Sequence, residues 1–335
     1  MALERFLADT WWYGLTRRLP EEKFVRLAGL RVEQGFSAVQ IVVGIPPEVG
    51  PENPSAASDV GPAWGLNGDI NPEYLALARR RIRLLNEMGL LAIIYGAWGH
   101  QIRWLGVEGM KRWWASVIQA TGDLRVLYCL TGESNLWVGE EARLLPGKTT
   151  GDLLPLRKLP AALAPFATRG AHVARQIRQR LAPSERARKR RRGNDRIAQR
   201  VQEWSEVLAF VAGLTDRPLL IHPLPGETSQ EAVRNPELLS AVTVQTGHDP
   251  SVRPLLWRWP QKILAANPEA RYINLEPWYE GIGGQFGPED QLFAYWVSML
   301  AGAHAYCYGA HGIWNVGDGA FLSHWGDQTF EQAAA

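Results

Sequence analysis

The chain has 335 residues, of which 46% are hydrophobic and 21% are charged, and its formal net charge is +2 at pH 7. These proportions are typical of a globular protein, and no stretch approaches the run of about 18 apolar residues that a membrane helix needs, so no membrane partner is expected. The first residues show no basic region followed by an apolar run, which predicts a cytoplasmic protein unless a leader was trimmed. Cys129 and Cys307 lie in apolar runs, where buried free thiols are expected.

In chain order, short apolar runs alternate with longer stretches of helical spacing. The predicted strands are Phe6–Thr10, Ala38–Val43, Leu90–Tyr95, Val126–Leu130, Pro218–Ile221, Val242–Gln245, Tyr272–Glu276 and Ala305–Tyr308. Between them, Pro20 opens a helix that runs to Gln34. Two apolar stripes predict further helices, one at Leu75, Ala78, Ile82 and Leu85, the other at Leu292, Tyr295, Met299 and Ala303.

This alternation is typical of βα units around a parallel sheet. Eight such strands predict an α/β fold, a (β/α)8 TIM barrel that occupies residues 1–335 as a single catalytic domain. An open doubly wound sheet is the rival architecture, but its nucleotide-binding form normally has a Gly-rich turn after an early strand, and the sequence has none. The sequence ends soon after the eighth strand, so the last helix is expected to be short, missing or replaced.

One segment departs from the regular spacing, at about residues 140–202 between the fourth and fifth strands. Its first half is rich in proline, and its second half is basic, with nine Lys or Arg and one Glu between Arg175 and Arg192. Such a run can bind nucleic acid or another anionic polymer. It can equally be a solvated helix face or a loop, and the lack of interleaved aromatic residues favours this second interpretation, so a nucleic-acid partner is not expected.

Two acidic residues follow strands whose C-terminal ends face each other across the mouth of a barrel, where TIM-barrel active sites lie. Glu133 follows the fourth strand, and Glu276 ends the seventh. Hydrolysis of a glycoside needs such a pair, because one carboxyl group protonates the leaving oxygen while the other attacks the sugar or activates water. Glu133 could instead cap a following helix. A buried carboxylate at Glu276 is costly unless it is paired or used.

Aromatic and polar side chains near the other strand ends suit a sugar, which has apolar faces and polar edges. The candidates for substrate binding are Asp9, Trp11, Trp12, Trp98, His100, Asn135, His222, His248, Trp278, Glu280, His311 and Trp314. Each histidine could also be a structural residue. No recognised metal-ligand spacing, nucleophile elbow or phosphate-binding loop is present, so neither a metal nor another cofactor is expected, and a zinc-dependent hydrolase barrel is only a formal alternative.

Four segments carry a resemblance to a known family: Phe6-Leu-Ala-Asp-Thr-Trp-Trp, Gln34-Gly-Phe-Ser-Ala-Val-Gln, Gly61-Pro-Ala-Trp-Gly-Leu-Asn-Gly-Asp-Ile-Asn-Pro-Glu-Tyr and Tyr308-Gly-Ala-His-Gly-Ile-Trp-Asn. With them the chain resembles, from end to end, the apiosidase-like glycoside hydrolases, a TIM-barrel family. The resemblance implies a retaining exo-glycosidase, with an acid/base on the loop after the fourth strand and a nucleophile at the seventh. Family members often have Gly-Asp where this chain has Gly132-Glu133, which moves the carboxyl group by about one methylene.

The sequence therefore predicts a glycosidase that removes a terminal sugar from an oligosaccharide or polysaccharide, with Glu133 and Glu276 as its catalytic pair. A carbohydrate-binding or catalytically inactive barrel is the first alternative, and binding of an anionic polymer through the Arg-rich segment is the second. The oligomeric state is left open by the sequence.

Overall fold

Eight parallel strands form the centre of the computed structural model, which describes residues 3–136 and 183–335, apart from the side chains of residues 183–194. The strands are β1 (Leu7–Trp11), β2 (Ala38–Val42), β3 (Leu91–Tyr95), β4 (Val126–Cys129), β5 (Leu219–Leu220), β6 (Val242–Gln245), β7 (Tyr272–Glu276) and β8 (Ala305–Cys307). Their order is β5-β4-β3-β2-β1-β8-β7-β6, so β1 pairs with β8. Between the two end strands, the amide of Ser240 donates to the carbonyl of Leu219 at 2.8 Å, and the sheet nearly closes into a barrel.

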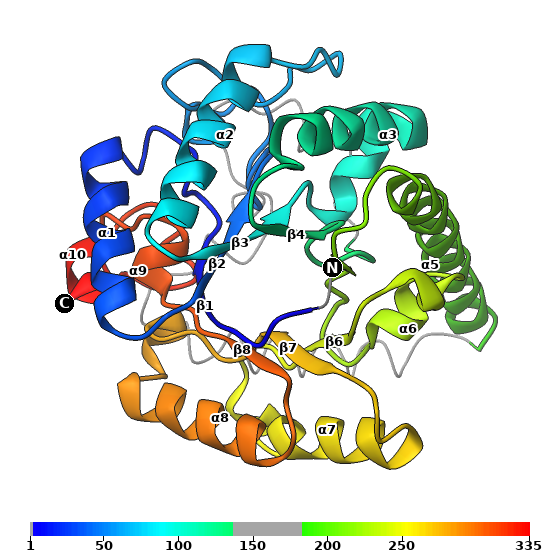
Figure 1. Ribbon diagram of the computed structural model, residues 1–335. Coiled ribbons are helices and arrows are strands. Elements are labelled where there is room, and N and C mark those ends of the chain that lie inside the picture. The colour runs from blue at the N-terminus through cyan, green and yellow to red at the C-terminus, as the bar shows by residue number, and fades with distance from the viewer. Residues whose placement is uncertain (1–2, 137–182) are drawn as a thin grey trace.

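Helices surround this barrel on the outside (Figure 1). The α-helices are α1 (Glu21–Glu33), α2 (Pro72–Glu87), α3 (Ile102–Thr121), α5 (Pro183–Ala212), α6 (Ser229–Ala232), α7 (Leu255–Ala266), α8 (Pro288–Leu300), α9 (His311–Trp314) and α10 (Phe330–Ala334). Short 3-10 helices are η1 (Pro54–Ala56), η2 (Gly99–Gln101), η7 (Pro236–Leu238), η8 (Pro250–Val252) and η9 (Ile282–Gly284). The predicted (β/α)8 TIM barrel is confirmed, and the helices that follow β8 are short.

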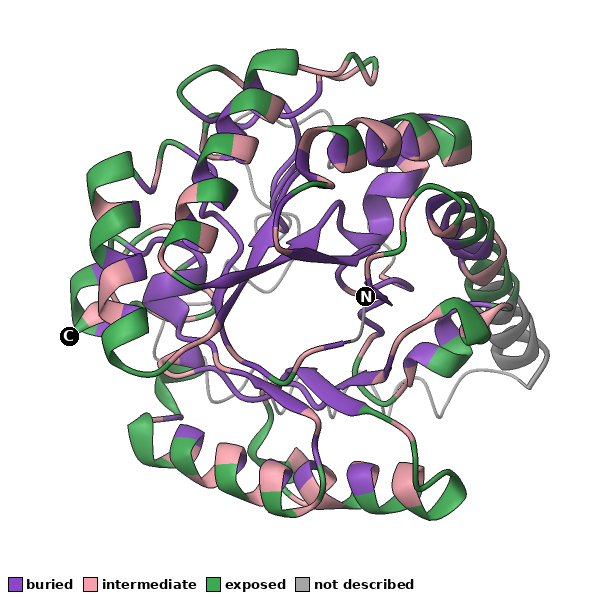
Figure 2. Cartoon of the chain, viewed as in Figure 1, coloured by how far each residue is buried: buried purple, intermediate pink, exposed green. Residues whose placement is uncertain are grey.

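Nearly all strand residues are buried, and helices cover the outside of the barrel (Figure 2). Successive residues of a strand point to opposite faces, so the strands are buried on both faces. Every residue of β2 and β3 is buried, which explains their continuous apolar sequences. The two cysteines are buried free thiols, as predicted. The observed strand bounds differ from the predicted ones by one residue at most.

The helical stripes were predicted less well. In α2 the stripe holds at Ala78, Ile82 and Leu85, but Leu77 is buried and Leu75 only partly so. In α8 the prediction was wrong at Leu292, which is 60% exposed. The smaller residues Ala294 and Ser298 face the barrel instead, beside Gln291. Gln291 is held there because its amide donates to the carbonyl of Gly309 at 3.2 Å.

The irregular segment between β4 and β5 is described only in part. Residues 140–182 lie outside the described residues, and from Pro183 onward the chain forms α5. The basic run Arg175–Arg192 therefore enters the described structure only as backbone of α5, and the hypothesis of anionic-polymer binding stays a prediction. Among the described helices, none is both long enough and apolar enough to cross a membrane.

Candidate active site

A cavity of about 670 Å³ lies at the C-terminal ends of the strands. Each of the eight strands contributes at least one residue to its wall, at the strand end or in the loop that follows. In strand order these residues are Trp12, Glu48, Trp98, Glu133, Pro225, His248, Glu276 and Trp314. This is the position at which TIM-barrel enzymes carry their active sites.

Glu133 reaches into this cavity from the loop after β4. Its carboxyl group accepts hydrogen bonds from the indole of Trp98, at 3.0 Å, and from the amide of Gln245, at 3.5 Å. The preceding residue must be glycine, because a Cβ on Gly132 would lie 2.4 Å from the Trp98 ring. Glu133 itself has a φ of 46°, in the left-handed region that non-glycine residues rarely adopt. Its side chain thus binds residues at the ends of two other strands, and the following segment, where a capped helix would lie, continues outside the described residues.

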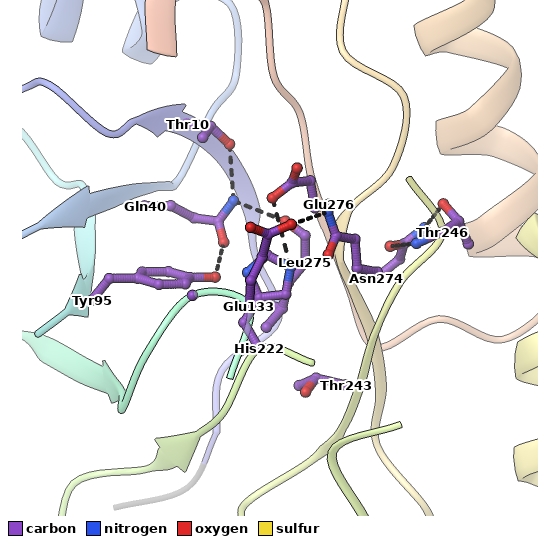
Figure 3. Close-up of polar contacts among 12 residues, drawn as sticks. Thr10, Gln40, Tyr95, Glu133, His222, Thr243, Thr246, Asn274, Leu275 and Glu276 are labelled. Carbon is purple, nitrogen blue, oxygen red and sulfur yellow. Dashed lines mark hydrogen bonds and ion pairs between the residues drawn. The ribbon is translucent and has the colours of Figure 1, made fainter. Parts of the chain in front are cut away.

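Glu276 enters the cavity from the end of β7 and is 6% exposed. Two histidines flank its carboxyl group: Nε2 of His248 lies 2.8 Å from Oε1, and Nε2 of His222 lies 3.6 Å from Oε2. Below the carboxyl group, the backbone is held by the barrel interior, where the amide of Gln40 donates to the carbonyl of Leu275 at 3.2 Å. The side chains of Glu133 and Glu276 meet in the same part of the barrel mouth (Figure 3).

Gln40 belongs to a buried polar chain beneath the cavity, which Figure 3 shows from Tyr95 to Thr10. The hydroxyl of Tyr95 donates to Gln40 at 2.6 Å, and Gln40 donates in turn to the hydroxyl of Thr10 at 2.9 Å. A satisfied network of this kind is rigid, because every member would lose a partner if one moved. This hydrogen-bonded network links β1, β2, β3 and β7, and it fixes the position of Glu276 at the end of β7.

The surroundings of the two glutamates push their pKa values apart. Burial, together with the nearby charge of Glu276, raises the pKa of Glu133 to about 7. Burial alone would also raise the pKa of Glu276, but the hydrogen bond and charge of His248, with smaller effects of His222 and Gln245, outweigh it, and the pKa of Glu276 is lowered. Near pH 6 the cavity therefore holds one protonated carboxyl group and one carboxylate, the combination that acid-assisted attack on a glycoside requires.

Several residues proposed from the sequence for substrate binding reach the cavity wall. They are Trp12, Trp98, His248 and Trp314. His222 lies behind Glu276, against the rings of Tyr95 and Trp98. Burial lowers the pKa of His222 to about 4, so its ring is neutral at pH 7.

The other proposed residues do not line the cavity, because they are occupied in the packing around it. Asp9 forms a buried ion pair with Arg31 and also accepts from the indole of Trp11. His100 packs against Trp104 with ring centroids 4.8 Å apart. The remaining side chains bind neighbouring loops: Asn135 to Glu227, Trp278 to Phe286 and Asp249, Glu280 to Tyr308 and Gln328, and His311 to Asn315.

Sequence reasoning missed seven polar or aromatic residues of the wall: Glu48, Gln245, Asp249, Tyr279, Gln285, His324 and Trp325. Gln245 and Glu48 carried a signal, because Gln245 ends a predicted strand and Glu48 lies in the loop after another. Trp325 carried none, since it stands far beyond the last strand. No group of three His, Cys, Asp or Glu within the described part of the chain could hold a metal ion.

Comparison with known families gives this geometry a context. The family model described as apiosidase-like, catalytic domain, matches residues 5–334. The chain belongs to the apiosidase-like family. It therefore carries a glycosidase catalytic domain, as the sequence predicted. A search of curated proteins finds no match.

Solved structures of similar fold are distant in sequence. A glycoside hydrolase family 5 protein from Bacteroides vulgatus ATCC 8482 matches with a TM-score of 0.67 and 14% identity, over 98% of this chain and 64% of that one. A second, described as a glycoside hydrolase, has a TM-score of 0.66 and 14% identity, over 98% of this chain and 66% of the other. An exo-β-1,4-mannosidase from Opitutaceae bacterium strain TAV5 has a TM-score of 0.51 and 12% identity, over 92% of this chain and 52% of that one. These matches support the barrel fold, and this chain spans less than two thirds of the length of the first two structures.

Proposed function

We propose that the protein removes a terminal sugar from an oligosaccharide or polysaccharide by a retaining mechanism, with Glu133 as general acid and base and Glu276 as nucleophile. The observation that carries this proposal is the separation of the two pKa values inside one cavity, where the pKa of Glu133 is raised to about 7 and that of Glu276 is lowered. Pairs of carboxyl groups with divergent pKa values mark acid and nucleophile in glycoside hydrolysis.

In the first step, an oxygen of Glu276 attacks the anomeric carbon while Glu133 gives its proton to the leaving oxygen, which departs as an alcohol. The product is a glycosyl ester on Glu276. In the second step, Glu133, now ionised, takes a proton from a water molecule as that water attacks the same carbon. The sugar leaves with its original anomeric configuration, and Glu133 is protonated again.

The rest of the wall offers both kinds of group that a sugar needs. Trp12, Trp98 and Trp314 present aromatic surface to the cavity. Among the described residues, Oε1 of Gln245, Nδ1 of His248 and Nε1 of Trp314 are buried and have no hydrogen-bond partner. Buried polar groups are normally paired, so these three atoms are suited to bind the hydroxyl groups of a substrate.

The test is hydrolysis of a panel of nitrophenyl glycosides and plant cell-wall oligosaccharides, apiosides included, by the wild type and by Glu276→Gln. We expect release by the wild type alone, and NMR of the first-formed product should show the anomer of the substrate. Release of the opposite anomer would show that the mechanism is inverting and not retaining. Sugar binding without release by the wild type would favour the carbohydrate-binding barrel instead.

A further inference from the structure

The loops after β2 and β8 meet at the edge of the cavity. The indole of Trp325 donates to Oε1 of Glu48 at 3.4 Å, and Nε2 of His324 lies 3.6 Å from Oε2 of the same carboxyl group. We call these three residues the Glu48 bridge. Since β2 and β8 flank β1 in the sheet, the bridge spans the side of the barrel mouth on which Trp12 follows β1.

The β2 end of the bridge is held in place from below. The hydroxyl of Tyr13 donates to the carbonyl of Pro47, and the amide of Gln101 donates to the carbonyl of Ile45 at 2.9 Å. Glu48 has a φ of 71°, in the left-handed region. Non-glycine residues keep such a conformation only where the surrounding structure enforces it, and these residues cluster at functional sites.

The β8 end is fixed against the loop after β7. The carbonyl of Trp325 accepts from the amide of Gly283 at 2.6 Å. The next residue must be glycine, because its φ is 155° and a Cβ on Gly326 would lie 2.5 Å from the carbonyl oxygen of Gly281. Trp325 is nevertheless 37% exposed, so part of its ring is accessible at the cavity wall. Two rigid segments thus present a carboxyl group, an imidazole and an indole to one cavity.

We propose that the Glu48 bridge closes the cavity on the β1 side and binds the terminal sugar residue of the substrate. This inference rests on the proposed function and names the residues that make cleavage exo-acting. The rest of an oligosaccharide must extend out of the cavity on the side of the leaving group. If the opposite side is closed, only the sugar at the end of the oligosaccharide can bind there. The carboxylate of Glu48 accepts hydrogen bonds from sugar hydroxyls, and the ring of Trp325 contacts an apolar face of the sugar.

Binding and turnover are measured separately, with Trp325→Ala and Glu48→Gln as the test variants. Trp296→Ala is the matched control, because Trp296 is 57% exposed on α8 and does not line the cavity. Each change is combined with Glu276→Gln, and NMR titration measures binding of D-apiose, D-xylose, L-arabinose, D-glucose, D-mannose and D-galactose. For a sugar that binds Glu276→Gln, we expect about tenfold weaker binding in both test variants and no change in the control.

The second measurement identifies the products that the bridge variants release, with Glu276 intact, from the oligosaccharides that the wild type cleaves. Wild type should release single terminal sugars, whereas Trp325→Ala should also release fragments of two or more sugars from within the chain. Binding and products equal to those of Trp296→Ala would overturn the role of the bridge while leaving the glycosidase intact. Binding of none of the six sugars by Glu276→Gln would also overturn it. Weakened binding with no turnover by the wild type would instead refute the glycosidase and keep the bridge.

Discussion

His248 places its Nε2 atom 2.8 Å from Oε1 of Glu276, and so ties the loop after β6 to the end of β7. The carboxyl group is almost fully buried, a position in which the neutral acid is normally favoured. This contact makes the largest contribution that lowers the pKa of Glu276, and with His222 and Gln245 it holds that pKa below its usual value despite burial. A buried carboxylate that is ionised and faces a cavity is suited to attack a substrate.

Replacing His248 by alanine should move the acidic limb of the pH profile. Without His248, burial raises the pKa of Glu276 against only the smaller lowering effects of His222 and Gln245, so a higher pH is needed to ionise the nucleophile. We expect the acidic limb of kcat/KM to shift upward by about 1 to 3 pH units. His304→Ala is the control, because His304 contacts the backbone of Leu3 and Glu4, away from the cavity. An unchanged limb would mean that another group sets the ionisation of Glu276.

The alkaline limb should report Glu133. The first step needs its proton, and burial with the charge of Glu276 raises the pKa of Glu133 to about 7. Activity should therefore be full below this pKa, provided that Glu276 is ionised, and should fall tenfold per pH unit above about pH 7. A pH profile of kcat/KM measures this limb. In Glu276→Ala, which lacks the neighbouring charge, a pH titration of Glu133 followed by NMR should show a lower pKa.

Substituting Glu133 by glutamine should affect substrates according to their leaving groups. Gln cannot donate a proton, so glycosides with alkyl or sugar leaving groups should lose about 10² to 10⁴-fold in kcat/KM. A dinitrophenyl leaving group departs without protonation, so its glycosylation step should be nearly unaffected. Steady-state and burst kinetics on both substrates separate the two steps. Equal losses on both would argue against an acid role for Glu133.

The barrel and its two glutamates could be predicted because each depends on local sequence. Strand and helix periods repeat in order along the chain, and an acidic residue at a strand end, such as Glu276, falls at the barrel mouth whatever the loops do. The direction in which a side chain points from a strand was harder to predict. Asp9 and Trp11 alternate with Thr10 along β1, and they point to the helix layer, where Arg31 pairs with Asp9.

Contacts between distant loops could not be predicted. The pairing of Glu48 with Trp325 joins residues separated by 277 positions, and no period or spacing rule relates them. Leu292 was misassigned for a similar reason, because the face that α8 turns inward is chosen by small residues and by Gln291, not by its largest apolar side chains. Tertiary packing overrides the local pattern at such positions.

The ion pair of Asp9 with Arg31 should stabilise the fold without contributing to turnover. Their side chains are 0% and 4% exposed, and Nε of Arg31 lies 2.6 Å from Oδ2 of Asp9. Asp9→Asn leaves a guanidinium buried without its counter-charge, which should lower the free energy of unfolding by about 3 to 5 kcal/mol. Glu331→Gln removes an exposed partner of Arg26 and should leave the free energy of unfolding nearly unchanged, because solvent screens an exposed ion pair. Denaturant unfolding measures both, and kcat/KM should stay within about twofold of wild type at temperatures where Asp9→Asn is folded, since Asp9 does not line the cavity. A large loss of kcat/KM in folded Asp9→Asn, with little loss of stability, would restore Asp9 to the substrate site.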